Sequence, residues 1–100
     1  MKLEDVRSRL LAHRQELKRL GAERLSLFGS VARGEAGPES DVDIVVDSEG
    51  GEALGLFRLA RLTDELERIL GRPVDVISRR GLEHTDVLKR RVAADLVDVF

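Results

Sequence analysis

Residues 27–46 read LFGSVARGEAGPESDVDIVV, and this stretch decides how the chain folds. Residues 25–28 predict a short strand that ends at Gly29, and residues 30–33 predict a single helical turn. A loop with a Gly-Pro pair follows, and residues 41–47 then alternate in character between two faces, as a strand does. We therefore expect two strands that are joined by a helical turn and a loop.

The residues before this stretch predict one long helix. Apolar residues recur at spacings of three and four over residues 3–20, and Gly21 is placed to end the helix. His13 falls on the apolar side of this helix. We expect His13 to pack in the protein or at an interface, because no second ligand residue lies one helical turn away.

The residues after this stretch predict the remaining elements from the same kind of pattern. Gly71 and Pro73 close a helix with a wide apolar face, and an apolar run follows them. The predicted segments are a helix at 52–70, a strand at 73–77, a loop at 79–85, a helix at 86–95 and an edge strand at 97–100. Their order predicts an α/β (α+β) fold, in which helices pack on one face of a small sheet and the other face stays partly open.

The composition limits the class of protein. With 100 residues, of which 42% are hydrophobic and 36% charged, the chain is expected to fold as one domain over residues 1–100. A net charge of -2 argues against a broadly basic nucleic-acid binder, and the lack of cysteine excludes a disulfide scaffold and a thiolate zinc site. The apolar runs are too short to span a bilayer, and the first residues do not resemble a signal peptide. We therefore expect a cytoplasmic protein that binds neither membranes nor nucleic acid.

Gly29, Ser30 and Arg33 are candidates for binding phosphate. Gly29 lets phosphate oxygens approach the backbone, and N–H groups at the start of a helical turn attract anions. The Ser30 hydroxyl adds a donor, and Arg33 lies three residues further along, on the same side of the turn. A Gly-Ser pair at the end of a strand is common, so these residues alone do not establish a site.

Three aspartates are candidates for binding metal. Asp41 and Asp43 lie two residues apart and share one face of a strand, where two anions repel unless a cation lies between them. Oxygen ligands of this kind suit Mg²⁺. Asp75 lies in another apolar strand, and if the two strands pair, the three carboxylates can hold two metal ions. In a purely structural interpretation, residues 40–43 form a capped turn and Asp75 faces solvent; the combination with the Gly-Ser pair favours the site.

Three motifs together resemble one known family. Residues 29–34 (GSVARG), 40–45 (SDVDIV) and 74–76 (VDV) resemble the minimal nucleotidyltransferases of the DNA polymerase beta superfamily. The resemblance covers roughly residues 20–100 and implies a nucleotidyltransferase palm-like fold with a small mixed sheet. It also implies that a nucleotidyl group is transferred from a nucleoside triphosphate, with release of pyrophosphate.

The resemblance implies a role for each residue that matches a motif. Asp75 would help to bind metal and would activate the acceptor hydroxyl. The residues implied at the triphosphate are Gly29, Ser30, Arg33 and Ser40. The residues implied as ligands of two Mg²⁺ ions, and as catalytic residues, are Asp41, Asp43 and Asp75.

Small members of this family are commonly antitoxins that are paired with a HEPN-domain ribonuclease toxin. The resemblance therefore implies that this chain transfers AMP from ATP to a tyrosine of such a toxin. At 100 residues the chain is expected to hold no separate domain for binding an acceptor, which also suggests that the acceptor is a protein surface. Residues 89–98 only approximate the acidic-Ala-Val stretch that the family often carries, a departure that concerns the contact with the partner.

Two other functions are compatible with the sequence. The chain could be a binding module that silences its partner by occlusion, with the apolar faces of residues 3–20 and 52–70 as contact surfaces. It could instead transfer nucleotides to a small molecule, although the lack of an acceptor domain argues against this.

Overall fold

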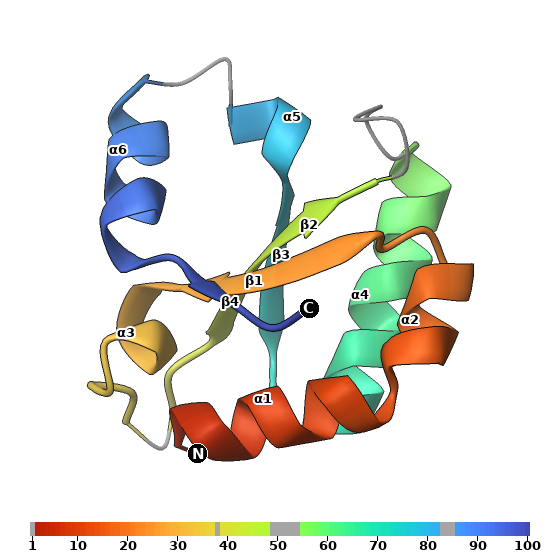
Figure 1. Ribbon diagram of the computed structural model, residues 1–100, viewed down its shortest axis with the longest axis horizontal. Coiled ribbons are helices and arrows are strands. Elements are labelled where there is room, and N and C mark those ends of the chain that lie inside the picture. Colours follow the sequence, from red (N-terminus) through yellow and green to blue (C-terminus); the bar gives the residue numbers. More distant parts are fainter. Residues whose placement is uncertain (1, 38, 49–54, 83–85) are drawn as a thin grey trace.

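A computed structural model of the chain describes residues 2–37, 39–48, 55–82 and 86–100 (Figure 1). The helices of the described residues are α1 (Leu3–Ala12), α2 (Arg14–Arg19), α3 (Gly29–Ala32), α4 (Leu56–Leu70), α5 (Arg79–Leu82) and α6 (Asp86–Asp95). The strands are β1 (Arg24–Phe28), β2 (Val42–Asp47), β3 (Val74–Ser78) and β4 (Val97–Asp98).

The four strands form one mixed sheet in the order β3-β2-β1-β4. Strand β1 is antiparallel to both β2 and β4, whereas β2 and β3 run parallel. A parallel pair needs a long crossover connection, and α4 lies within the segment that joins β2 to β3 (Figure 1). The predicted α/β fold with a small mixed sheet is thereby confirmed.

One face of the sheet carries the main core. Val42, Ile44 and Val46 of β2 are each at most 1% exposed, and they pack with residues of α1, α2 and α4. Helix α4 carries leucines at helical spacing and ends at Gly71, which adopts a left-handed conformation with φ of 67°. The hydrophobic effect therefore fixes which side of each strand faces these helices.

The second face carries a smaller apolar cluster. Phe28 of β1 and Val45 of β2 pack there against Leu82 of α5 and Val92 of α6. Helices α5 and α6 therefore cover part of the face that the sequence analysis expected to be partly open. Asp43, the second residue of β2, lies on this face and is only half-buried.

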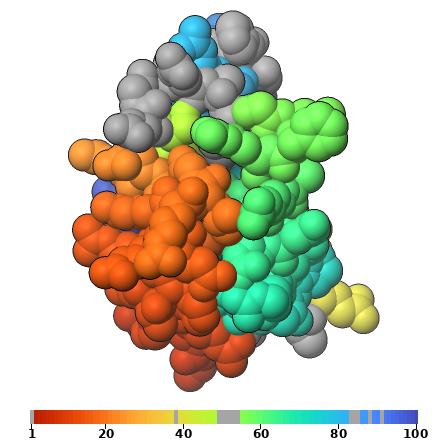
Figure 2. All heavy atoms as spheres, turned by 90° about the vertical axis from the view of Figure 1, so that its right-hand side faces the viewer, coloured from red at the N-terminus to blue at the C-terminus, as the bar shows by residue number. Residues whose placement is uncertain are grey.

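The predicted helix at residues 3–20 is wrong in one respect, because the backbone leaves helical geometry at His13, with φ of -110° and ψ of 18°. Both Leu10 and Leu17 are buried, so the apolar spacing continues across the break and could not reveal it. Helix α2 lies beside α4 on the surface (Figure 2). The side chains of Glu16 and Arg68 approach to 3.3 Å between these two helices.

The predicted loop at residues 79–85 is also wrong in part. Residues 79–82 form α5, while residues 83–85 lie outside the described residues. The predicted start of the second long helix, at residues 52–54, lies outside them as well. No helix in the described part of the chain is long and apolar enough to cross a membrane.

Candidate active site

Gly29 lies at the junction of β1 and α3 and is in contact range of Asp43. Its φ of 72° is in the left-handed region, which favours glycine. A Cβ atom at this position would overlap the Asp43 carboxylate. Glycine is therefore needed here for two reasons, the backbone conformation and the space that the carboxylate occupies, and sequence analysis gave neither of them.

Asp43 and Asp75 are direct partners in the parallel pair of β2 and β3. Partners in register point to the same face of a sheet. This is the face opposite to the main core, because the neighbours of Asp43 on β2 face the core. Asp41 directly precedes β2 and is exposed. The structure thus brings Asp43 and Asp75 together, as the sequence analysis expected if their strands paired.

The surroundings of Asp43 disfavour its charged form. Partial burial raises the pKa of its carboxyl above the ordinary value, and the negative charges of Asp75 and Asp41 raise it further. The positive charge of Arg33 acts in the opposite direction. The three aspartates therefore share one electrostatic environment with an arginine, in which a bound cation would lower the energy of the charged carboxylates.

The two paired carboxylates offer oxygen ligands of the kind that Mg²⁺ prefers. Within the described part of the chain, no group of three His, Cys, Asp or Glu side chains is placed to hold a metal ion by itself. Mg²⁺ commonly takes only one or two carboxylates and completes its shell with water and substrate phosphates. Asp43 and Asp75 fit that requirement, while the full three-carboxylate cluster stays a prediction.

Arg33 follows α3 directly and is held by two carboxylates. Its Nε donates a hydrogen bond to Glu35 Oε2 at 2.9 Å, and its Nη1 donates to Asp95 Oδ2 at 2.7 Å. The bonds to Glu35 and Asp95 raise the pKa of Arg33, which is already charged at any relevant pH. The sequence analysis did not identify Asp95, although it lies in the stretch of residues 89–98 that only approximates the family pattern.

Ser40 shapes the loop before β2. Its hydroxyl accepts a hydrogen bond of 2.9 Å from the backbone N–H of Gly37, and its own N–H donates to the Gly37 carbonyl at 3.2 Å. These two bonds close a turn just before Asp41. A contact between Ser40 and nucleotide stays a prediction.

An ion pair lies at the far end of β2, on the same face of the sheet as Asp43. Arg79, at the start of α5, donates from its Nε to Asp47 Oδ1 at 2.7 Å. Next to it, a cavity of about 220 Å³ lies between α5 and α6. The residues that line it are Arg79, Leu82, Lys89, Val92, Ala93 and Leu96. From one end of β2 to the other, this face therefore carries acids, then apolar residues, then an ion pair.

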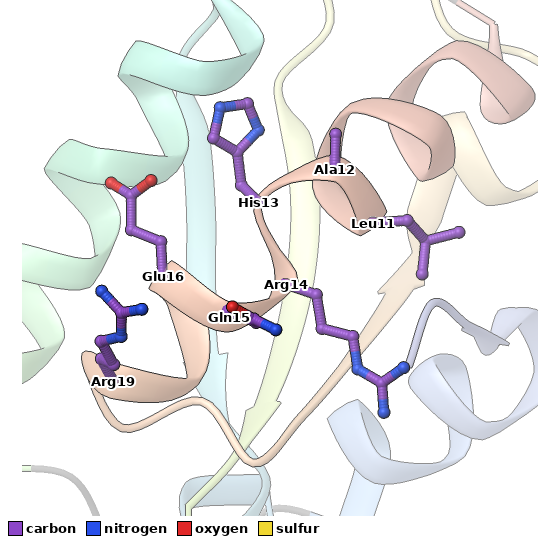
Figure 3. A pocket seen from close by; sticks show the side chains of 7 residues that line it. All are labelled: Leu11, Ala12, His13, Arg14, Gln15, Glu16 and Arg19. Atoms are coloured by element: carbon purple, nitrogen blue, oxygen red, sulfur yellow. The ribbon is translucent and has the colours of Figure 1, made fainter.

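A second hollow, of about 530 Å³, lies where helical geometry is interrupted between α1 and α2 (Figure 3). It is lined by residues 11–16 and Arg19, none of which the sequence analysis placed in a site. His13 lies here, and its Nδ1 is 2.9 Å from the Arg9 carbonyl oxygen. This hollow contains no cluster of acids, so the chemistry is expected at Asp43 and Asp75.

The comparisons with known proteins identify the family. A family model described as nucleotidyltransferase domain matches residues 10–98. The chain belongs to this family. The predicted enzyme class, nucleotidyltransferase, is thereby confirmed.

Individual relatives of this nucleotidyltransferase agree with that result. Protein adenylyltransferase MntA of Thermococcus cleftensis is 43% identical over 82 residues, which are 81% of each chain. A solved structure assigned to a minimal nucleotidyltransferase is 42% identical, with a TM-score of 0.77, and the match covers 97% of this chain and 95% of that one. The predicted resemblance to minimal nucleotidyltransferases is thereby confirmed.

A more distant structure shares the fold. It is a complex of a tri-AMPylated HEPN toxin of Shewanella oneidensis with an MNT antitoxin. The match has a TM-score of 0.61 at 20% identity and covers 90% of this chain and 71% of that one.

Proposed function

We propose that this nucleotidyltransferase is the antitoxin of a HEPN/MNT pair and transfers AMP from ATP to a tyrosine of its toxin. The observation that carries the proposal is the pairing of Asp43 with Asp75 in register, with Gly29 against the Asp43 carboxylate. The 43% identical relative, which is named a protein adenylyltransferase, supports the choice of AMP and of a protein acceptor. The complex with an AMPylated HEPN toxin supports the choice of partner.

In this proposal residues 1–100 act as one domain, and each candidate residue has a stated role. Asp75 accepts the proton of the acceptor hydroxyl, because it lies on the edge strand β3 and is exposed. The residues that bind the triphosphate are Gly29, Ser30, Arg33 and Ser40. The residues that hold Mg²⁺, and that are catalytic, are Asp41, Asp43 and Asp75.

The proposed reaction is a single displacement at the α-phosphate of ATP. The tyrosine oxygen forms a bond to the α-phosphorus, and the bond from that phosphorus to the bridging oxygen of pyrophosphate breaks. The hydroxyl proton passes to the Asp75 carboxylate, and pyrophosphate leaves. Bound Mg²⁺ would neutralise charge on the phosphates and on the aspartates.

A transfer assay tests this proposal. The purified protein is incubated with its HEPN toxin, Mg²⁺ and ATP that is labelled at the α-phosphate. We expect label on a toxin tyrosine, and we expect Asp43→Asn to reduce the rate by about 10³-fold, because Asp43 would hold the Mg²⁺ that neutralises charge at the reacting phosphate. Asp64→Asn on α4 removes one exposed charge outside the site and serves as the matched control. Undiminished label with Asp43→Asn would contradict the assigned site.

One observation favours a second function, which is inhibition by occlusion. Leu56 and Phe57 at the start of α4 are 80% and 91% exposed, and adjacent exposed apolar side chains form a patch of the kind that contacts a partner. A chain that carries both Asp41→Asn and Asp43→Asn separates the two functions in cells. If that chain still neutralises the toxin, occlusion is sufficient; if neutralisation is lost, transfer is required.

A further inference from the structure

Arg33 has carboxylate partners from two distant parts of the chain. Glu35 is its neighbour in the same loop, whereas Asp95 comes from the last residue of α6, 62 positions away in sequence. The side chain of Glu35 is 68% exposed, and that of Asp95 only 22%. Since water and salt screen exposed ion pairs, the pair with Asp95 is the better sheltered of the two.

The position of Asp95 is fixed by the sheet itself. Two residues after it, Val97 of β4 pairs with Leu27 of β1. The buried Ser26 hydroxyl then donates a hydrogen bond of 2.9 Å to Asp98 Oδ1. Strand β1 leads directly into Gly29, so the carboxylate that holds Arg33 is attached to the same strand that presents the glycine.

We propose that Asp95 is a positioning residue, which holds the Arg33 guanidinium in the orientation that binds the phosphates of the nucleotide. This inference rests on the proposed function of the site. A guanidinium has five N–H donors, and the bonds to Glu35 and Asp95 use two of them. Donors therefore remain for a phosphate, while the two carboxylates fix the plane of the group. The stretch of residues 89–98 thus acts on nucleotide binding through Arg33.

A competing effect would have the opposite sign. If Asp95 mainly neutralised Arg33, or repelled the phosphates, its removal would tighten phosphate binding. If Asp95 positions Arg33, its removal weakens binding, because the free side chain must lose rotamer freedom when the phosphate binds. The direction of the change in affinity therefore separates the two effects.

Calorimetric titration tests this inference without an acceptor. The ligands are ATP and inorganic tripolyphosphate, each with Mg²⁺, and the proteins are wild type, Asp95→Asn, Asp95→Glu and the control Asp64→Asn. We expect Asp95→Asn to lower the affinity for both ligands by about tenfold, which is the range for one charge-assisted hydrogen bond. Asp95→Glu should retain most of the affinity, because the ion pair can form again, and Asp64→Asn should bind like wild type.

A double-mutant cycle shows whether Asp95 acts through Arg33. In the background of Arg33→Gln, Asp95→Asn should cause no further loss of affinity. A similar loss in both backgrounds, or tighter binding by Asp95→Asn, would overturn the inference, and so would equal affinities of Asp95→Asn and Asp64→Asn. If wild type itself binds neither ligand, the proposed function fails instead. Should Asp95→Asn not fold, Arg33→Lys keeps the charge without the planar fork, and it should show the same tenfold loss.

Discussion

The two faces of β2 differ although their residues alternate along one strand. Ile44 is fully buried against the helices of the main core, whereas its neighbour Asp43 is half-buried beside another carboxylate. Burial of Ile44 stabilises the fold at every pH, because its side chain carries no titratable group. The charge on Asp43 opposes folding, because burial and two like charges act against it. One face of the strand thus holds the protein together, and the other carries at Asp43 a cluster of negative charges that Arg33 balances only in part.

The largest effect on stability is expected on the face of β2 that packs into the main core. Ile44→Ala should lower the free energy of unfolding by about 2–5 kcal/mol, since it removes a fully buried side chain and leaves a cavity. Denaturation in urea, followed by circular dichroism, measures this loss. A loss below about 1 kcal/mol would show that this face is not closely packed.

An intermediate effect on stability is expected at two glycines, Gly29 at the start of α3 and Gly34 shortly after its end. Gly29 and Gly34 have nearly the same φ, 72° and 74°, so alanine should cost about 1–2 kcal/mol at either position for backbone strain. Only at Gly29 would the new Cβ also displace the Asp43 carboxylate, whereas the space at Gly34 is open. We therefore expect Gly29→Ala to be the less stable variant and to bind ATP poorly, and Gly34→Ala to bind it normally. Equal stability and equal ATP affinity of the two variants would contradict this contact.

The smallest effect on stability is expected at Asp43, on the opposite face of β2. Its sign is reversed, because Asp43→Asn should stabilise the protein. The raised pKa of Asp43 means that the folded state binds the proton more tightly than the unfolded state. The stability of the wild type should therefore fall as pH rises from the ordinary value of 3.8 through the raised pKa. Asp43→Asn lacks this loss, so it should melt at a higher temperature than wild type at neutral pH without Mg²⁺.

Melting curves over a range of pH check this sign. At pH values well below 3.8 both proteins should melt at similar temperatures, because Asp43 is then almost wholly uncharged in the folded and in the unfolded wild type. Asp64→Asn controls for the loss of one charge from an exposed position. A lower melting temperature for Asp43→Asn at neutral pH would show that this face stabilises the fold, and the contrast between the two faces would fail.

Much of the sheet could be predicted from local patterns. The strand expected at residues 41–47 is β2 at Val42–Asp47, and the one expected at 73–77 is β3 at Val74–Ser78. The assignment of Asp43 to the face opposite to Ile44 follows from the two-residue period alone. The break at His13 was missed, because the apolar spacing of the first helix continues across it.

The sequence by itself determined the family, the order of the four strands along the chain, and the face on which Asp43 lies, since short motifs and alternation are local properties. Only the tertiary structure decided that Asp75 is the register partner of Asp43 and that Asp95 reaches Arg33. Both contacts join segments far apart in the chain. Their positions depend on how the crossover through α4 and the return of β4 to β1 pack, and no local pattern encodes that packing.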